Sequence, residues 1–174
     1  MKNKVKAYIA HGMSHREWND VMNESLFCQQ VLEEYGIDCV DPVDIENIPD
    51  HSKPIPIRTD AEGKKAWSED KKAISNCHVL IDITPHLKSE GVAHEIGLMR
   101  YHYWKPVVRV LKPGTPKPMI PYFDDDVLVY SLYEAAELIN KKWGTWWKRF
   151  KWRLAIYRHS RLKALYDEIR FWFQ

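Results

Sequence analysis

Short apolar segments alternate with longer amphipathic segments along most of this chain. The clearest is "HVLIDI", residues 78–83, a nearly continuous apolar run of the kind found in strands that are buried on both faces. Similar runs occur in "KVKAYIA", "IDCVDPV", "PVVRVL" and "DVLVY", with helix-period segments between them. Strands that alternate with helices form right-handed parallel crossovers. We therefore predict an α/β fold: an open, mostly parallel, flavodoxin- or Rossmann-like sheet flanked by helices.

The helices can be placed between these runs. We expect a first helix that stops at Gly36, further helices over residues 64–76, 89–103 and 131–143, and a long irregular connection over 46–63. In an open parallel sheet, ligands bind at the carboxyl ends of the strands. The loops after Ala10, Ile83 and Leu111 are therefore the expected places for a site.

Length and composition limit the class of protein. A chain of 174 residues, 45% hydrophobic and 29% charged, is typical of one soluble domain with a real core. Its three cysteines lack CxxC spacing, which argues against a disulfide framework and favours the cytoplasm. The N-terminal apolar run is too short for a signal peptide, and no segment approaches the ~20 apolar residues of a membrane span.

The charge is divided unevenly. From Lys141 onward there are ten Lys and Arg against two acids, a balance of +8, and the first 140 residues carry 16 − 22 = −6. The same terminal region holds five of the eight tryptophans. We therefore divide the chain into an α/β domain, 1–143, and a basic, aromatic-rich C-terminal helical extension, 144–174.

Three partners suit an extension of this composition. Its apolar stripe can pack on the same protein or on a second copy. It can also lie on an anionic membrane surface, which would place the protein peripherally at the membrane. Nucleic acid, with aromatic side chains stacked on bases, is the least favoured of the three.

The segment "SEGVAHEIGLM", residues 89–99, places a single carboxylate in the middle of a predicted helix. Ser89 stands at the N-cap position, where a helix start also favours anions. Gly91 precedes Glu95 by one turn, so nothing on that stripe covers the approach to the carboxylate. A glycine inside a helix costs about 1 kcal/mol relative to alanine. A glycine at this position could be explained either by room for a ligand or by close packing of the helix on a strand.

Four segments together resemble a known family. "AYIAHGMS", "WSEDKKAISNCHVLIDIT", "SEGVAHEIGLM" and "YWKPVVRV" resemble, in order and separation, the nucleoside 2-deoxyribosyltransferase-like family, including the 2-deoxynucleoside 5-monophosphate N-glycosidases. The resemblance covers roughly residues 4–140 and leaves out the extension. It implies an enzyme that cleaves N-glycosidic bonds of a nucleoside or nucleotide without cofactor or metal, as a homodimer or larger homo-oligomer.

The resemblance also implies three catalytic residues. Glu95 matches the nucleophile that attacks the anomeric carbon of the sugar, and Asp70 matches the acid that helps to protonate the leaving base. Tyr8 matches the tyrosine that positions the nucleophile. A pair of carboxylates suits this reaction, because one stabilises or captures the oxocarbenium-like sugar while the other supplies a proton.

Further residues are implied in substrate binding. Ser89 matches the serine with which monophosphate hydrolases bind phosphate, Gly91 leaves room beside it, and Glu90 is the alternative contact to the sugar because the preceding loop is about two residues longer. In the first loop, His11 occupies the position of the family's glycine, and Gly12 follows one place later. The remaining implied contacts are Arg16, as an added donor, and Lys117, which would come from the second subunit of a dimer.

Three functions follow from these residues. We predict hydrolysis of a 2-deoxynucleoside 5-monophosphate through Glu95. Base exchange between nucleosides is the alternative that shares the nucleophile. A non-catalytic nucleotide-binding module tethered by the basic extension is the alternative from another class. Scattered His and Cys residues lack HExxH or paired CxxC spacing, so no metal site is expected.

Overall fold

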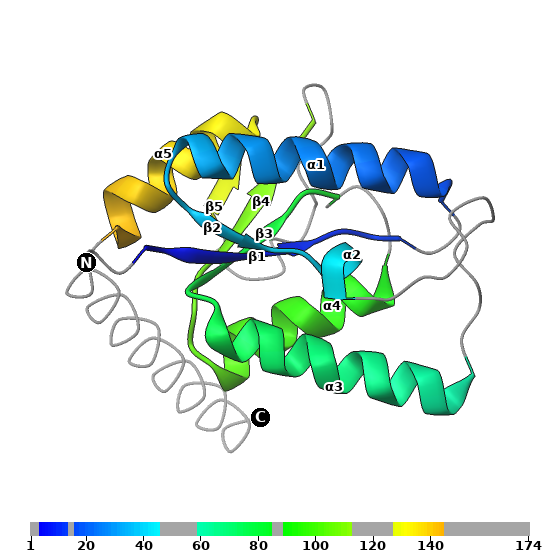
Figure 1. Cartoon of the computed structure of the whole chain (residues 1–174). Coiled ribbons are helices and arrows are strands. Elements are labelled where there is room, and N and C mark those ends of the chain that lie inside the picture. The colour runs from blue at the N-terminus through cyan, green and yellow to red at the C-terminus, as the bar shows by residue number, and fades with distance from the viewer. Residues whose placement is uncertain (1–3, 14–15, 46–58, 85–88, 113–126, 145–174) are drawn as a thin grey trace, which may run out of the picture.

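The computed structural model describes residues 4–13, 16–45, 59–84, 89–112 and 127–144 (Figure 1). Its strands are β1 (Lys6–Ala10), β2 (Asp38–Val40), β3 (Val79–Asp82), β4 (Val107–Val110) and β5 (Val127–Val129). Its helices are α1 (Trp18–Glu34), α2 (Pro42–Ile45), α3 (Asp60–Asn76), α4 (Glu90–Gly97), the π-helical segment η1 (Leu98–His102) and α5 (Leu132–Trp143).

The five strands form one parallel sheet in the order β2-β1-β3-β4-β5. Helices α1 and α5 cover one face of the sheet, and α3, α4 and η1 cover the other (Figure 1). The predicted α/β fold with flanking helices is therefore confirmed. Residues 145–174 of the extension and Lys117 lie outside the described residues.

Alternation along the central strands decides which side chains face which helices. Ala7 and Ile9 pack in the core under α1 and α5, whereas Tyr8 and Ala10 belong to the core under α3 and α4. The period of two in a strand produces this division. Tyr8 is thereby directed at the helix layer that contains Glu95.

Several predicted boundaries were wrong. The helix expected over 64–76 begins earlier, at Asp60, because Thr59 and Glu62 form a capping box. The segment expected to prolong the second strand instead turns into α2, whose start is capped by the Asp41 side chain accepting from Val43 N at 2.9 Å. Pro42 suits the first position of a helix, since its missing N–H needs no acceptor there.

The helix expected over 89–103 is not uniform. It is α-helical up to Gly97 and then widens into the π-helical segment η1. Segments of this kind are rare and occur often at functional sites. Within the described residues, none of the helices is long and apolar enough to span a membrane.

Candidate active site

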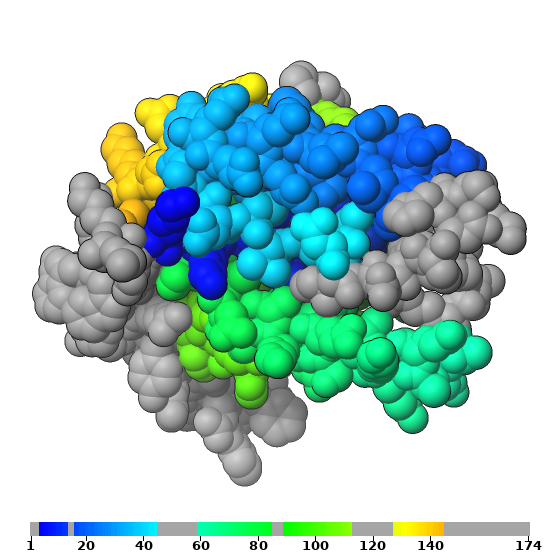
Figure 2. Space-filling view, in the orientation of Figure 1, coloured from blue at the N-terminus to red at the C-terminus, as the bar shows by residue number. Residues whose placement is uncertain are grey.

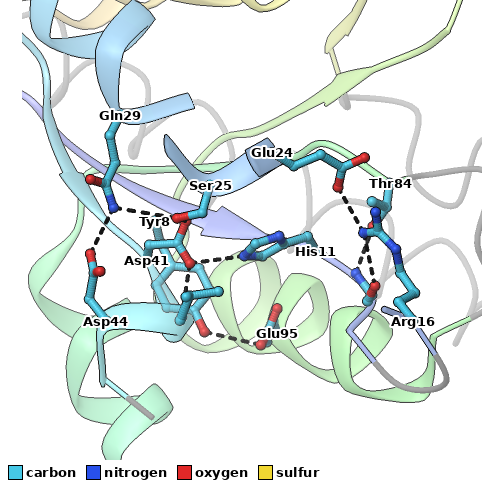
Figure 3. Close-up of polar contacts among 12 residues, drawn as sticks. Tyr8, His11, Arg16, Glu24, Ser25, Gln29, Asp41, Asp44, Thr84 and Glu95 are labelled. Carbon is cyan, nitrogen blue, oxygen red and sulfur yellow. Dashed lines mark hydrogen bonds and ion pairs between the residues drawn. The ribbon is translucent and has the colours of Figure 1, made fainter. Parts of the chain in front are cut away.

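Tyr8 and Glu95 are joined by a buried hydrogen bond. The Tyr8 hydroxyl donates to Glu95 Oε1 at 3.0 Å, although the two residues are 87 positions apart in the chain (Figure 3). Tyr8 comes from the middle of the buried strand β1, and Glu95 from the inner side of α4. The contact ties the helix to the centre of the sheet.

Glu95 is buried among groups that disfavour its charge. Only 8% of the residue is exposed, although Gly91 one turn earlier on the same stripe is exposed. Burial raises the pKa of Glu95 well above its ordinary value, and the charge of Asp70 raises it further. The Tyr8 hydrogen bond opposes this by favouring the carboxylate. The second oxygen, Oε2, has no hydrogen-bond donor among the described residues.

Asp70 lies on the inner side of α3, with 8% of its surface exposed. Among the charged groups, it has the largest effect on the pKa of Glu95. Burial, followed by the charges of Glu95 and Asp70, also raises the pKa of Tyr8 far above its usual range, so its hydroxyl remains a donor. The structure therefore brings together the three residues to which the family resemblance gives catalytic roles.

His11 takes part in a network that the sequence did not reveal. Its Nε2 lies 2.9 Å from Asp41 Oδ1, and both side chains are fully buried. Asp41 Oδ2 accepts from the Ser25 hydroxyl at 2.8 Å (Figure 3). His11 is thus held against the end of β2 rather than left open in the loop. The Asp-Pro pair that starts α2 was the available signal for Asp41.

Gly12 connects the first loop to the loop after β3. Its backbone N–H donates to Thr84 Oγ1 at 2.7 Å, and the Thr84 N–H donates to Asp82 Oδ1 at 3.0 Å. Asp82 also forms a buried ion pair with Arg109 on β4, at 3.6 Å. This network fixes the carboxyl ends of three neighbouring strands. Sequence reasoning missed Thr84 and Arg109.

Arg16 contacts the protein itself. Its guanidinium donates to Glu24 Oε2 at 2.7 Å and to the Gly12 carbonyl at 3.4 Å. It therefore braces the first loop against α1. A phosphate would have to compete with Glu24 for it.

Ser89 caps α4 as predicted, accepting from Val92 N at 3.4 Å. It is half-buried, whereas Glu90 is exposed. Gly91 is exposed as well, and a Cβ added there would meet only Ser89 Oγ, at 3.8 Å. Close packing of helix on strand therefore does not explain this glycine.

A groove of about 500 Å³ follows the β2 edge of the sheet, and none of the predicted site residues lines it. In the described part of the chain, no group of three His, Cys, Asp or Glu side chains is placed to hold a metal ion. The buried carboxylates beside Tyr8 are therefore the stronger candidate site.

No protein-family model matches the chain, and no curated protein matches its sequence. Among solved structures, it is similar to a 2-deoxyribosyltransferase from the psychrotolerant bacterium Bacillus psychrosaccharolyticus, with a TM-score of 0.56 and 17% identity over 76% of this chain and 90% of the other. The chain has a fold similar to that of a 2-deoxyribosyltransferase.

A conserved protein from Enterococcus faecalis V583 matches with a TM-score of 0.53 and 16% identity, over 79% of this chain and 98% of the other. The CMP N-glycosidase BcmB of Clostridium botulinum has a TM-score of 0.47 and 14% identity, over 78% and 98% of the two chains. The first two likenesses support the fold that the sequence resemblance implies.

Proposed function

We propose that this protein hydrolyses the N-glycosidic bond of a 2-deoxynucleoside 5-monophosphate, with Glu95 as the nucleophile. The observation that supports this most directly is the buried Tyr8–Glu95 hydrogen bond, with Asp70 beside it. It lies near the carboxyl ends of parallel strands, where such folds bind ligands. The likeness in fold to a 2-deoxyribosyltransferase agrees with the same chemistry.

The proposed reaction has two steps. A Glu95 oxygen attacks the anomeric carbon while the bond to the base nitrogen breaks, and the base takes a proton from Asp70. Water then attacks the same carbon, returns a proton to the Asp70 carboxylate, and releases the sugar phosphate and free Glu95. Both carboxylates return to their starting state.

The proposed reaction requires the proton to lie on Asp70 when the substrate is bound, whereas burial and the charge of Asp70 raise the pKa of Glu95 in the free protein. Two nearby carboxylates hold one proton between them more readily than they ionise together. The Tyr8 hydroxyl donates to Glu95 and thereby favours the ionised form of that residue. Asp70 is then left as the proton donor to the base.

Phosphate recognition is assigned to the start of α4. Ser89 lies at the cap, and the first turn of a helix presents unpaired N–H groups and a partial positive charge. Gly91 leaves the surface beside it open. His11 and Gly12 shape the neighbouring loop, and Arg16 braces it. Lys117 of a second subunit stays a prediction, as does the homodimer itself.

Base exchange between nucleosides is the second candidate function. The fold likeness to a 2-deoxyribosyltransferase favours it, and Glu95, Asp70 and Tyr8 would keep the same roles. A non-catalytic nucleotide-binding module is less favoured. Burying Glu95 with one oxygen lacking a described donor costs stability, and a binding module gains nothing from a nucleophile.

The deciding experiment measures release of free base from a panel of deoxynucleosides and their 5-monophosphates by liquid chromatography. Glu95→Gln is the test variant, and Glu137→Gln on the exposed side of α5 is its matched control. Base released from a monophosphate by wild type and control, but not by Glu95→Gln, supports the proposal. Release only after a second base is added indicates transfer. Turnover retained by Glu95→Gln removes Glu95 from the mechanism.

A further inference from the structure

Exposed apolar side chains gather on one helix layer. Five large apolar residues are exposed in the described part of the chain. Four of them belong to this layer: Leu26 and Phe27 lie on α1, Tyr133 lies on α5, and Tyr130 lies just before α5. Phe27 is 50% exposed and Tyr133 45% exposed, and their rings meet edge to face at 6.3 Å. We call these four residues the α1/α5 patch. Figure 2 shows α1 running openly across the surface.

Helix α1 gives one side of the patch a net negative charge. Helix α1 contains four acids and no Lys or Arg: Asp20, Glu24, Glu33 and Glu34. Asp20 and Glu34 are each seven positions from Phe27 and therefore share its stripe. On α5, Glu134 and Glu137 are exposed near Tyr133, and Lys141 and Lys142 are exposed in the last turn of the helix. An occupant of the patch must accordingly be apolar and basic.

The end of the described chain lies close to this layer. Phe27 meets Tyr133, and Asn140 Nδ2 donates to the Tyr35 carbonyl at 2.8 Å, so α1 and α5 run side by side in the same direction. Gly144 follows at the end of both helices. A Cβ added to Gly144 would overlap the Asn140 carbonyl, so only glycine fits where the chain leaves α5.

We propose that residues 145–174 fold back and dock on the α1/α5 patch. These 30 residues contain eight Lys and Arg against two acids, together with nine aromatic residues. Tyr133 is eleven positions before Gly144, about 16 Å of helix. Thirty residues cover that distance even if they are fully helical, at ~45 Å. The segment therefore has the length, the charge and the apolar content that the patch requires.

A second copy of the same patch is a poorer occupant. Two α1/α5 patches brought together would oppose acidic rims, and juxtaposed like charges are unfavourable at an interface. The opposite helix layer suits the extension less well, because α3 carries no net charge: four lysines are balanced by four acids, Asp60, Glu62, Glu69 and Asp70. Charge therefore selects the α1/α5 patch over these alternatives.

A photo-crosslinking experiment on the full chain tests the docking. The photoreactive residue p-benzoylphenylalanine replaces Phe27, and the matched control places it at Tyr101, which is 57% exposed on the other helix layer. Normal and isotope-labelled chains are mixed before irradiation, and the cross-linked peptides are identified by mass spectrometry. We expect crosslinks from position 27 to 145–174 of the same chain, about tenfold more abundant than from position 101. Raising the salt to about 0.5 M should reduce them.

Other outcomes overturn the proposal. Crosslinks from position 27 to a second copy would assign the patch to an interface between copies. Equal yields from both positions, or none to 145–174, would show that the extension does not dock there. If the wild-type chain floats with phosphatidylserine vesicles, and the variant with the photoreactive residue at position 27 forms no crosslinks, the extension would be assigned to a membrane surface. These outcomes do not depend on catalysis, so the failure of the proposed function would leave this test intact.

Discussion

Replacing Tyr8 with phenylalanine removes one hydroxyl from the site and leaves the packing almost unchanged. That hydroxyl donates to Glu95 Oε1 at 3.0 Å inside the core. Since Oε2 has no described donor, the carboxylate of the variant loses the single hydrogen bond that the described residues give it. The hydrogen bond lowers the pKa of Glu95, so its loss raises that pKa. A smaller fraction of the nucleophile is then ionised at a given pH.

The size of the effect follows from the type of bond. A hydrogen bond to a charged group contributes about 1.5–3 kcal/mol, and each 1.4 kcal/mol is tenfold in rate or equilibrium. We therefore expect kcat/KM of Tyr8→Phe to fall about ten- to hundredfold on the acidic side of the pH profile. The acidic limb should move to higher pH, and the ratio of wild type to variant should shrink as pH rises.

The assay is base release as a function of pH, with Tyr103→Phe as the matched control. The Tyr103 hydroxyl donates to the Lys71 carbonyl at 3.4 Å on the exposed side of α3, so its loss removes a hydroxyl without touching Glu95. The control should keep the wild-type profile. A Tyr8→Phe profile that coincides with wild type, or a loss that is the same at every pH, would show that Tyr8 does not control the ionisation of Glu95.

Three further variants test the other parts of the site. Glu95→Gln should lose about a thousandfold or more in turnover. Because the pKa of Glu95 is raised in the folded state, the wild-type protein loses stability as the pH rises above the pKa of the unfolded chain. The melting temperature of the variant should therefore rise relative to that of wild type between pH 5 and pH 8. Ser89→Ala should cost about 1 kcal/mol in urea unfolding through the lost cap, and should lower kcat/KM for monophosphates more than for nucleosides. Asp41→Ala should cost about 1–3 kcal/mol in the same assay, because it removes the acceptor of His11, Ser25 and Val43 N; a cost below about 0.5 kcal/mol would contradict the network.

The parallel sheet and the positions of most elements were predictable, because they depend on local patterns. The apolar run before Asp82 and the alternation in β1 are sufficient to identify buried strands. Helix ends were less predictable. Thr59 and Glu62 were a readable capping signal that was missed, whereas no proline or other breaker in the sequence signals the change to π-helix after Gly97.

The candidate site was predictable in its members but not in its environment. The resemblance named Tyr8, Asp70 and Glu95, and the fold brings them together. The burial of Glu95 was missed, because a glycine one turn away indicates space on one side only. The partners of His11 were also missed, since the Asp41 carboxylate comes from another loop and no spacing in the sequence relates the two.

The buried carboxylates of this site are of two kinds, those with a partner that compensates their charge and those without one. Asp41 faces His11, and Asp82 faces Arg109, so each has a cationic or hydrogen-bonding partner that holds a loop in place. Glu95 interacts most strongly with another acid, Asp70, and only the Tyr8 hydroxyl favours its charge. Of two carboxylates coupled in this way, one keeps its proton to a higher pH than an isolated acid does. That property is of no use to a structural ion pair, and it is what an acid and a nucleophile acting on one glycosidic bond require.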